Sequence, residues 1–194
     1  MKRNELLNLA GKNFIANNAI AEILARGGEM MILEPAVIKG NDAGLCAAIE
    51  GCRVCYDADG LHVIYHDASG EFTGRCKSAY AVGDYVYVRE SFYEDDGKVR
   101  YLTDWKPGGE FLKHRVTISR YMPKKNARLF FRVRGVKLKR LFDLNSSELR
   151  RLGVDNYVRC FALYDSTLSE RKYAVARSEV NPYVFVYDIE VWKF

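Results

Sequence analysis

The stretch from Ala127 to Phe142, ARLFFRVRGVKLKRLF, alternates apolar and basic residues. Phe131 and Val133 lie between arginines, and the pattern resumes with lysines after Gly135. A period of two is that of a β-strand, whose successive side chains point to opposite faces. The alternation changes phase at Gly135, and a bulge or bend there would explain the change. The chain must therefore build a sheet around this segment.

The other patterned segments are helices near both ends of the chain and short strands between them. Apolar residues at helical spacing predict helices in 4–14 and 17–28, the second closing on a Gly-Gly pair. Further along we expect a buried strand in 29–37, hairpins in 52–72, an alternating strand in 83–92 with its hairpin partner in 95–104, helices in 143–154 and 156–174, and a final strand in 181–194. This order predicts an α+β domain around a mixed or closed sheet.

Length and composition limit the class of protein. The 194 residues, 48% of them hydrophobic, suit one domain over 1–194 with a single core. Within it we expect N-terminal helices in 1–28 and a β-rich insertion in 38–77. The sequence has no run of about 18 apolar residues and no secretory-signal pattern. We therefore expect a cytoplasmic chain without a membrane partner.

The five cysteines, an odd number, are typical of a reducing compartment rather than a disulfide framework. Four of them gather in one region: Cys46, Cys52, Cys55 and Cys76. The spacing of Cys52 and Cys55 is that of a zinc-binding pair, but no second pair follows. Zinc binding and simple thiols on short strands both stay open, and we assign no metal and no cofactor.

Basic side chains dominate one part of the chain. Phe111 to Phe142 holds eleven Lys or Arg and no Asp or Glu, although the whole chain has a net charge of only +5. Exposed strand faces are often basic, but acids usually lie among the bases and limit repulsion. A field of one sign attracts phosphates, so the pattern favours a polyanion over a solvated face. Trp105 and Tyr121 are candidates for stacking on bases.

Two adjacent charges in the alternating strand are also informative. Arg89 and Glu90 should point to opposite faces, so one of them must face the interior, where a charge needs a partner. The candidate partners for Glu90 are Arg128 and Arg120. A similar argument applies to the adjacent Phe130 and Phe131, at least one of which should belong to the core.

Five short pieces resemble, in order, the motifs of a known family. They are GDYVYVRESF (83–92), WKP (105–107), MPKKNARLFFRV (122–133), LFDLNSSELRRLGV (141–154) and NPYVFVYDIE (181–190). They are similar to the G-D-x-hydrophobic-x-V-R-E-[ST], W-[KR]-P, M-P-x-x-x-[SA]-R, L-x-D-[IL]-[ST]-x-x-[DE] and N-P-[WY]-V elements of ASCH domains in the PUA-like superfold, phage and prophage type. The resemblance covers about residues 15–194. It implies a small β-barrel with flanking helices and a cleft for RNA or modified bases.

Some enzymes of that family use a Lys and a Thr from an early K-x-x-T motif, and a Glu before a helix-ending Gly, to hydrolyse N4-acylated cytidine. Here residues 27–31, GGEMM, stand where the Lys, Thr and paired Arg are expected, and Leu152 stands in place of the Glu. Gly and Met supply neither a nucleophile, a base nor an oxyanion donor. Glu29 could act as a base, but a lone carboxylate beside a Gly-Gly turn is more often solvated.

Together these observations predict a nucleic-acid-binding PUA-like module without catalytic activity, for RNA or a modified or single-stranded polynucleotide. A ribonuclease or N4-acylcytidine amidohydrolase of the same fold, and a phage protein that binds a host protein, are the alternatives. Oligomeric state is left open. The predicted contact residues are Arg89, Glu90, Trp105, Arg120, Tyr121, Lys124, Lys125, Arg128, Arg132 and Arg134.

Overall fold

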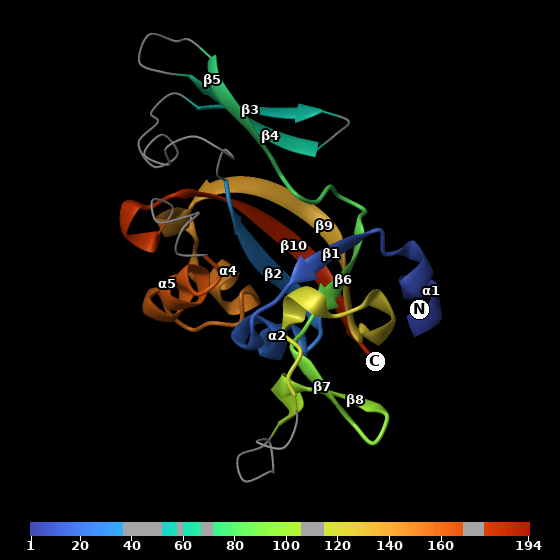
Figure 1. The fold of residues 1–194 in the computed structure, drawn as a ribbon. Helices are drawn as coiled ribbons and strands as arrows, with labels where there is room; N and C mark the ends of the chain where they lie inside the picture. The colour runs from blue at the N-terminus through green and yellow to red at the C-terminus, as the bar shows by residue number, and fades with distance from the viewer. Residues whose placement is uncertain (37–51, 58–59, 67–71, 106–114, 169–176) are drawn as a thin grey trace. The chain divides into compact units, whose positions relative to one another are not determined.

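The computed structural model describes residues 1–36, 52–57, 60–66, 72–105, 115–168 and 177–194 (Figure 1). Contacts divide the chain into two compact units. Unit 1 consists of Met1–Glu29, Asp84–Arg132 and Glu190–Phe194, and unit 2 of Met30–Gly83 and Val133–Ile189. The single-domain prediction stays a prediction. No helix in the described ranges is long and apolar enough to cross a membrane.

The helices in the described residues overlap the ranges predicted for them. They are α1 (Arg3–Leu9), α2 (Asn18–Leu24), α4 (Ser146–Arg151) and α5 (Tyr157–Asp165). The side chain of Asn17 accepts a hydrogen bond from the backbone of Ile20, and Asn145 forms a capping box with Glu148. These side chains satisfy backbone N–H groups that the first turn of a helix leaves unpaired. Part of the predicted 156–174 helix lies outside the described residues.

Within the described ranges, five short 3₁₀ helices connect the other elements. They are η1 (Leu102–Asp104), η3 (Ser119–Tyr121), η4 (Lys124–Asn126), η5 (Leu141–Asp143) and η6 (Ser178–Val180). Turns of this tight kind commonly join longer elements. Two of them, η3 and η4, lie inside the basic part of the sequence.

Ten strands in the described residues form three sheets. They are β1 (Lys12–Ile15), β2 (Gly28–Pro35), β3 (Cys52–Asp57), β4 (Gly60–His66), β5 (Phe72–Lys77), β6 (Tyr85–Arg89), β7 (Phe92–Asp95), β8 (Lys98–Tyr101), β9 (Leu129–Arg140) and β10 (Tyr183–Lys193). The largest sheet has the order β1-β6-β9-β10-β2, the second β3-β4-β5, and the third β7-β8. The α+β class is confirmed.

The prediction of a closed β-barrel is wrong for the described strands. Closure requires a hydrogen-bonded ladder between the first and last strands of the order. Here β1 and β2 stand at opposite ends of the order and do not pair with each other. β1 has only four residues, three of them exposed, and offers little strand for a second partner.

Strand β1 was missed because residues 4–14 read as one helix. The helix α1 ends at Leu9, and Lys12 to Ile15 then pair in parallel with β6. The ring of Phe14 packs edge-on against Phe131, 5.9 Å between centroids. So short a strand is stabilised by its neighbour rather than by its own propensity, and tertiary contact overrides the local pattern.

The hairpin prediction for 95–104 was right about the turn and wrong about the partner. Asp96 and Gly97 both have positive φ, as a tight hairpin turn requires. The strand that pairs with β8 is β7, whereas β6 pairs with β1 and β9. The chain leaves β6 after Arg89, so the 83–92 run divides into two strands.

The hairpins predicted in 52–72 are confirmed as the antiparallel β3-β4-β5 sheet in unit 2. Cys46 and the side chains of Cys52 and Cys55 lie outside the described residues. Cys76 and Cys160 are buried and form no disulfide within the described residues, and burial raises the pKa of the Cys160 thiol to about 11. The described residues contain no group of three metal-binding side chains.

Each unit has its own apolar cluster. In unit 1 the buried members are Leu6, Ala10, Phe92, Met122, Ala127 and Phe130. In unit 2 they are Met31, Leu141, Leu144, Leu149, Leu152, Cys160, Tyr164, Val184 and Val186. Both Phe130 and Phe131 are fully buried, which confirms that this aromatic pair serves the core.

Strand β9 continues through Gly135, where the sequence suggested a bulge or bend. A Cβ atom at Gly135 would lie 3.0 Å from the Oδ2 atom of Asp188. That carboxylate is held by ion contacts with Lys137 and Arg151. The glycine is therefore explained by the close approach of Asp188.

We expect the substitution Gly135→Ala to lower the free energy of unfolding by about 1 kcal/mol, because the held carboxylate of Asp188 must move. Urea unfolding followed by circular dichroism measures the change. Gly11→Ala is the matched control, because a Cβ there meets nothing within 4 Å. Equal stability of the two variants would show that Asp188 yields freely.

Candidate nucleic-acid interface

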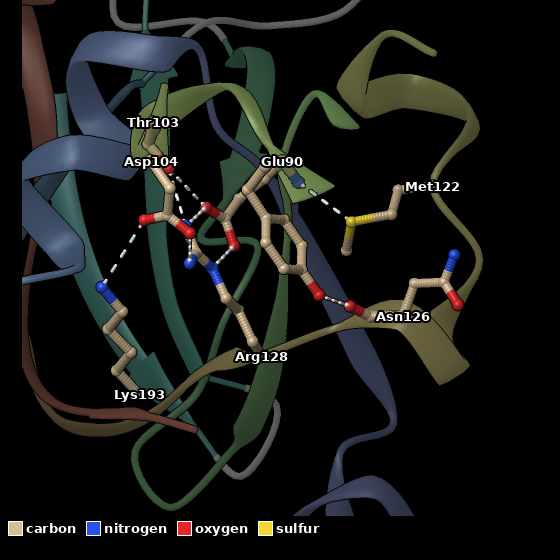
Figure 2. A network of polar contacts seen from close by, with 8 residues as sticks. Glu90, Thr103, Asp104, Met122, Asn126, Arg128 and Lys193 are labelled. Carbon is tan, nitrogen blue, oxygen red and sulfur yellow. Dashed lines mark hydrogen bonds and ion pairs between the residues drawn. The ribbon is translucent and has the colours of Figure 1, made fainter. Parts of the chain in front are cut away.

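A bidentate ion pair in unit 1 joins Glu90 to Arg128 (Figure 2). Arg128 Nε donates to Glu90 Oε2 at 3.1 Å, and Nη2 donates to Oε1 at 3.0 Å. Only 1% of the Glu90 side chain and 8% of the Arg128 side chain are exposed. Of the two candidate partners for Glu90, the structure selects Arg128.

Further polar groups complete this network. Arg128 Nη2 donates to Thr103 Oγ1 at 2.7 Å, and the Thr103 hydroxyl donates to Glu90 Oε1 at 3.2 Å. Arg128 Nη1 bonds to Asp104, whose other oxygen lies 3.8 Å from Lys193 Nζ (Figure 2). Asp104 is half exposed, so the network runs from the interior to the surface.

Tyr101 closes the network from one side. The guanidinium carbon of Arg128 lies 3.9 Å from the centre of the Tyr101 ring, a cation–π distance. Burial and the charge of Glu90 raise the pKa of Tyr101, so its hydroxyl stays protonated and donates to the carbonyl of Asn126. Burial acts to lower the pKa of Arg128, but hydrogen bonds to Glu90 and Asp104 outweigh it and raise that pKa.

The alternation of β6 places these groups. Val86, Val88 and Glu90 are buried on one face, as the period of two predicts. Arg89, half-buried on the other face, donates from Nε to the carbonyl of Met122 at 3.1 Å. The backbone N–H of Glu90 donates to the Met122 sulfur at 3.4 Å. The adjacent residues Arg89 and Glu90 therefore both bind Met122.

Met122 belongs to residues 115–127, which we call the basic loop. Arg3 of α1 donates to the carbonyls of Lys125 and Ala127. Tyr101 holds Asn126 from the other side. These contacts fix the backbone of the loop. Its side chains therefore project from fixed positions.

The basic loop carries cations that form no ion pair with the acids described in the structure. Its exposed side chains include Arg115, Arg120, Tyr121 and Lys125. Lys124 is half-buried and lies 5.8 Å from the centre of the Tyr87 ring. Within the described ranges no carboxylate forms an ion pair with Arg115, Arg120, Lys124 or Lys125. Tyr121, 68% exposed, lies among these charges.

Two basic residues later in the segment, both in unit 2, form ion pairs with acidic residues. Lys137 Nζ lies 3.1 Å from Asp188, and Lys139 Nζ lies 2.7 Å from Glu148. Arg151 Nη1 approaches Asp188 Oδ1 at 2.7 Å, in an ion contact without hydrogen-bond geometry. Burial acts to raise the pKa of Glu148, but its hydrogen bond with Lys139 helps to lower that pKa. Acids that are distant in sequence thus neutralise part of the positive charge of the 111–142 segment.

The predicted contact residues fall into distinct environments. Exposed or half-exposed groups in unit 1 are Arg89, Trp105, Arg120, Tyr121, Lys124, Lys125 and Arg132. Glu90 and Arg128 are buried and bonded to each other, which suits a positioning role. Arg134 is exposed and belongs to unit 2. The basic residue Lys113 lies outside the described residues.

Sequence reasoning missed four members of the network: Tyr101, Thr103, Asp104 and Lys193. Three of them directly precede Trp105, whose motif drew attention to the aromatic ring alone. The one available signal was that whichever of Arg89 and Glu90 faces the interior needs a partner. That rule identifies a requirement, but it does not identify which polar residues meet it.

The positions that correspond to the family's catalytic groups can also be placed. Gly27 and Gly28 have positive φ at the end of α2, and Glu29 is exposed. Leu152 belongs to the apolar cluster of unit 2. These side chains provide one solvated carboxylate and otherwise no acid–base or nucleophilic group.

Comparisons with protein-family models, with curated proteins and with solved structures found no match to this chain. The resemblance to ASCH domains therefore remains an expectation from five short motifs. The case for function rests on the geometry and charge of unit 1.

Proposed function

We propose that this chain is a nucleic-acid-binding module that holds single-stranded RNA on its basic loop. The observation that carries the proposal is a set of cations, Arg115, Arg120, Lys124 and Lys125, without ion-pair partners in the described ranges. Cations of this kind attract phosphates and release counterions when phosphates bind. The PUA-like, ASCH-type assignment from five motifs belongs to the same proposal, without the closed barrel.

Single-stranded nucleic acid suits the aromatic residues in this region. Tyr121 is 68% exposed and Trp105 is 41% exposed. Exposed aromatic rings among cations are typical of proteins that stack unpaired bases while contacting the backbone. Bases inside a duplex already stack on each other, so a duplex would use the cations but not the rings.

The backbone anchors support a preformed surface. The basic loop is held by Arg3, Arg89 and Tyr101, each through a backbone carbonyl. A ligand that meets an ordered loop does not bear the entropy cost of ordering it. We therefore assign binding rather than catalysis to this surface.

The first test is fluorescence anisotropy with a labelled single-stranded RNA of about 12 nucleotides, a length within the range of single-strand site sizes. We expect the logarithm of the binding constant to fall linearly with the logarithm of salt concentration, by about 0.7 for each phosphate contact. Four contacts would give a slope of about −3. A duplex of the same sequence should bind more weakly.

The same samples separate the alternatives. Intact RNA after incubation, and N4-acetylcytidine left unhydrolysed, are expected for a binding module. Absence of RNA binding at low salt, or a slope near zero, would contradict the proposal. Cleavage of either substrate would favour the enzyme alternative. Capture of a protein that survives nuclease treatment, without RNA binding, would favour the protein-binding alternative.

A further inference from the structure

Arg132 in unit 1 lies in an aromatic setting that the sequence did not reveal. It stands directly opposite Tyr85 in the antiparallel pairing of β6 with β9, so the two side chains share one face of the sheet. The guanidinium carbon lies 5.4 Å from the centre of the Tyr85 ring. On the same ring, Trp192 of β10 stacks at 6.3 Å and 19°. All three side chains are partly buried.

The guanidinium of Arg132 has one N–H group that no described residue satisfies. Its Nε atom is buried and has no hydrogen-bond partner. In the described part of the chain no carboxylate pairs with Arg132, whereas Arg128 has two and Lys137 and Lys139 have one each. A partly desolvated cation without an acceptor is unfavourable by itself. An anionic ligand would bind the partly exposed guanidinium at its Nη groups and supply the counter-charge that the described residues do not provide.

We propose that Arg132 is a phosphate-binding residue, held in place by the stacked rings of Tyr85 and Trp192, and that it extends the RNA path beyond the basic loop. This inference rests on the proposed function. The planar guanidinium offers parallel N–H donors that match the oxygens of a phosphate. Stacking on Tyr85 limits its freedom, so less entropy is lost when a phosphate binds.

The spacing along β6 connects this residue to the basic loop. Tyr87 lies two residues after Tyr85 on the same face, about 6.8 Å along the strand. Lys124 of the loop lies over Tyr87 as Arg132 lies over Tyr85. The two tyrosines that these cations contact therefore lie about 7 Å apart along one strand. That interval between the tyrosine positions is close to the length of one extended nucleotide, so Lys124 and Arg132 are placed to contact neighbouring phosphates of a single strand.

The test compares wild-type protein, Arg132→Gln and Arg132→Lys in the salt series with the same RNA. For Arg132→Gln we expect affinity at low salt to fall about tenfold and the slope to become shallower by about 0.7, the loss of one phosphate contact. Arg132→Lys should restore the slope, because it restores the charge. Lys137→Gln is the matched control on the same strand, since Lys137 is paired with Asp188.

Each outcome decides the inference. An unchanged slope in Arg132→Gln, with wild type still binding RNA, would overturn the Arg132 contact and leave the proposed function standing. An unchanged slope with relaxed sequence preference would assign Arg132 to a base and equally overturn the phosphate contact. No binding by wild type would remove the proposed function itself.

A second measurement does not depend on the folding of a variant. Wild-type protein is treated with an arginine-modifying reagent with and without the RNA, and modified sites are read by mass spectrometry. We expect the RNA to protect Arg132 and to leave the exposed Arg159 reactive. Equal modification of Arg132 with and without bound RNA would overturn the inference.

Discussion

The substitution Arg128→Met is expected to lower the free energy of unfolding by about 3–5 kcal/mol. It removes the guanidinium that makes two hydrogen bonds to Glu90. Among the side chains that the structure describes, the buried carboxylate then keeps only the Thr103 hydroxyl as a partner. A buried charge without a counter-charge carries its full desolvation penalty. Urea unfolding at neutral pH, followed by circular dichroism, measures the loss.

The control is Arg159→Met, the same substitution in an exposed ion pair. Arg159 pairs there with Asp155. Its loss should stay below about 1 kcal/mol, because water and salt screen that pair. The double variant Glu90→Leu, Arg128→Met should recover part of the stability, since it leaves no unpaired charge in the interior. If Arg128→Met were no less stable than Arg159→Met, the network would not contribute to the fold.

The second large effect concerns binding. Reversing Arg120, Lys124 and Lys125 to Glu should weaken single-stranded RNA binding by about 100-fold or more at low salt, because three attractive contacts become repulsive. Arg128 is left unchanged in this variant, because its replacement would disturb the fold rather than the surface. Anisotropy titration measures affinity, and circular dichroism confirms folding.

The matched control reverses three exposed cations outside the basic loop: Lys98, Arg150 and Arg159. Both triple variants carry the same net charge, so a general effect of charge would weaken binding equally in both. We expect the control to lose much less affinity than the loop variant. Equal losses would show that RNA responds to total charge rather than to the basic loop.

Local pattern predicted much of the secondary structure. The strict alternation of β6 correctly placed Val86, Val88 and Glu90 on one face, and the structure shows that this face is buried. The Asn145 cap and the Asp96–Gly97 turn also use residue types that favour such positions. These features depend on residues close together in sequence, and steric and hydrogen-bonding preferences act at that range.

The errors have a common physical origin. β1 is a four-residue strand that exists through its pairing with β6, and β8 pairs with β7 rather than β6. Barrel closure was expected from a family resemblance, yet the order of the described strands has two free ends. Contacts across the fold decide which strands pair. Alternation within a segment predicts a strand, but it does not predict the partner of that strand.

The candidate site shows the same division. The sequence by itself determined that 111–142 is basic without acids, that either Arg89 or Glu90 faces the interior, and that an interior charge needs a partner. Only the tertiary structure chose Arg128, 38 positions from Glu90, brought Asp188 and Glu148 to Lys137 and Lys139, and left Arg132 against Tyr85 without an acid. Charge is a property of composition, but neutralisation depends on distances of a few ångströms, and folding sets those distances.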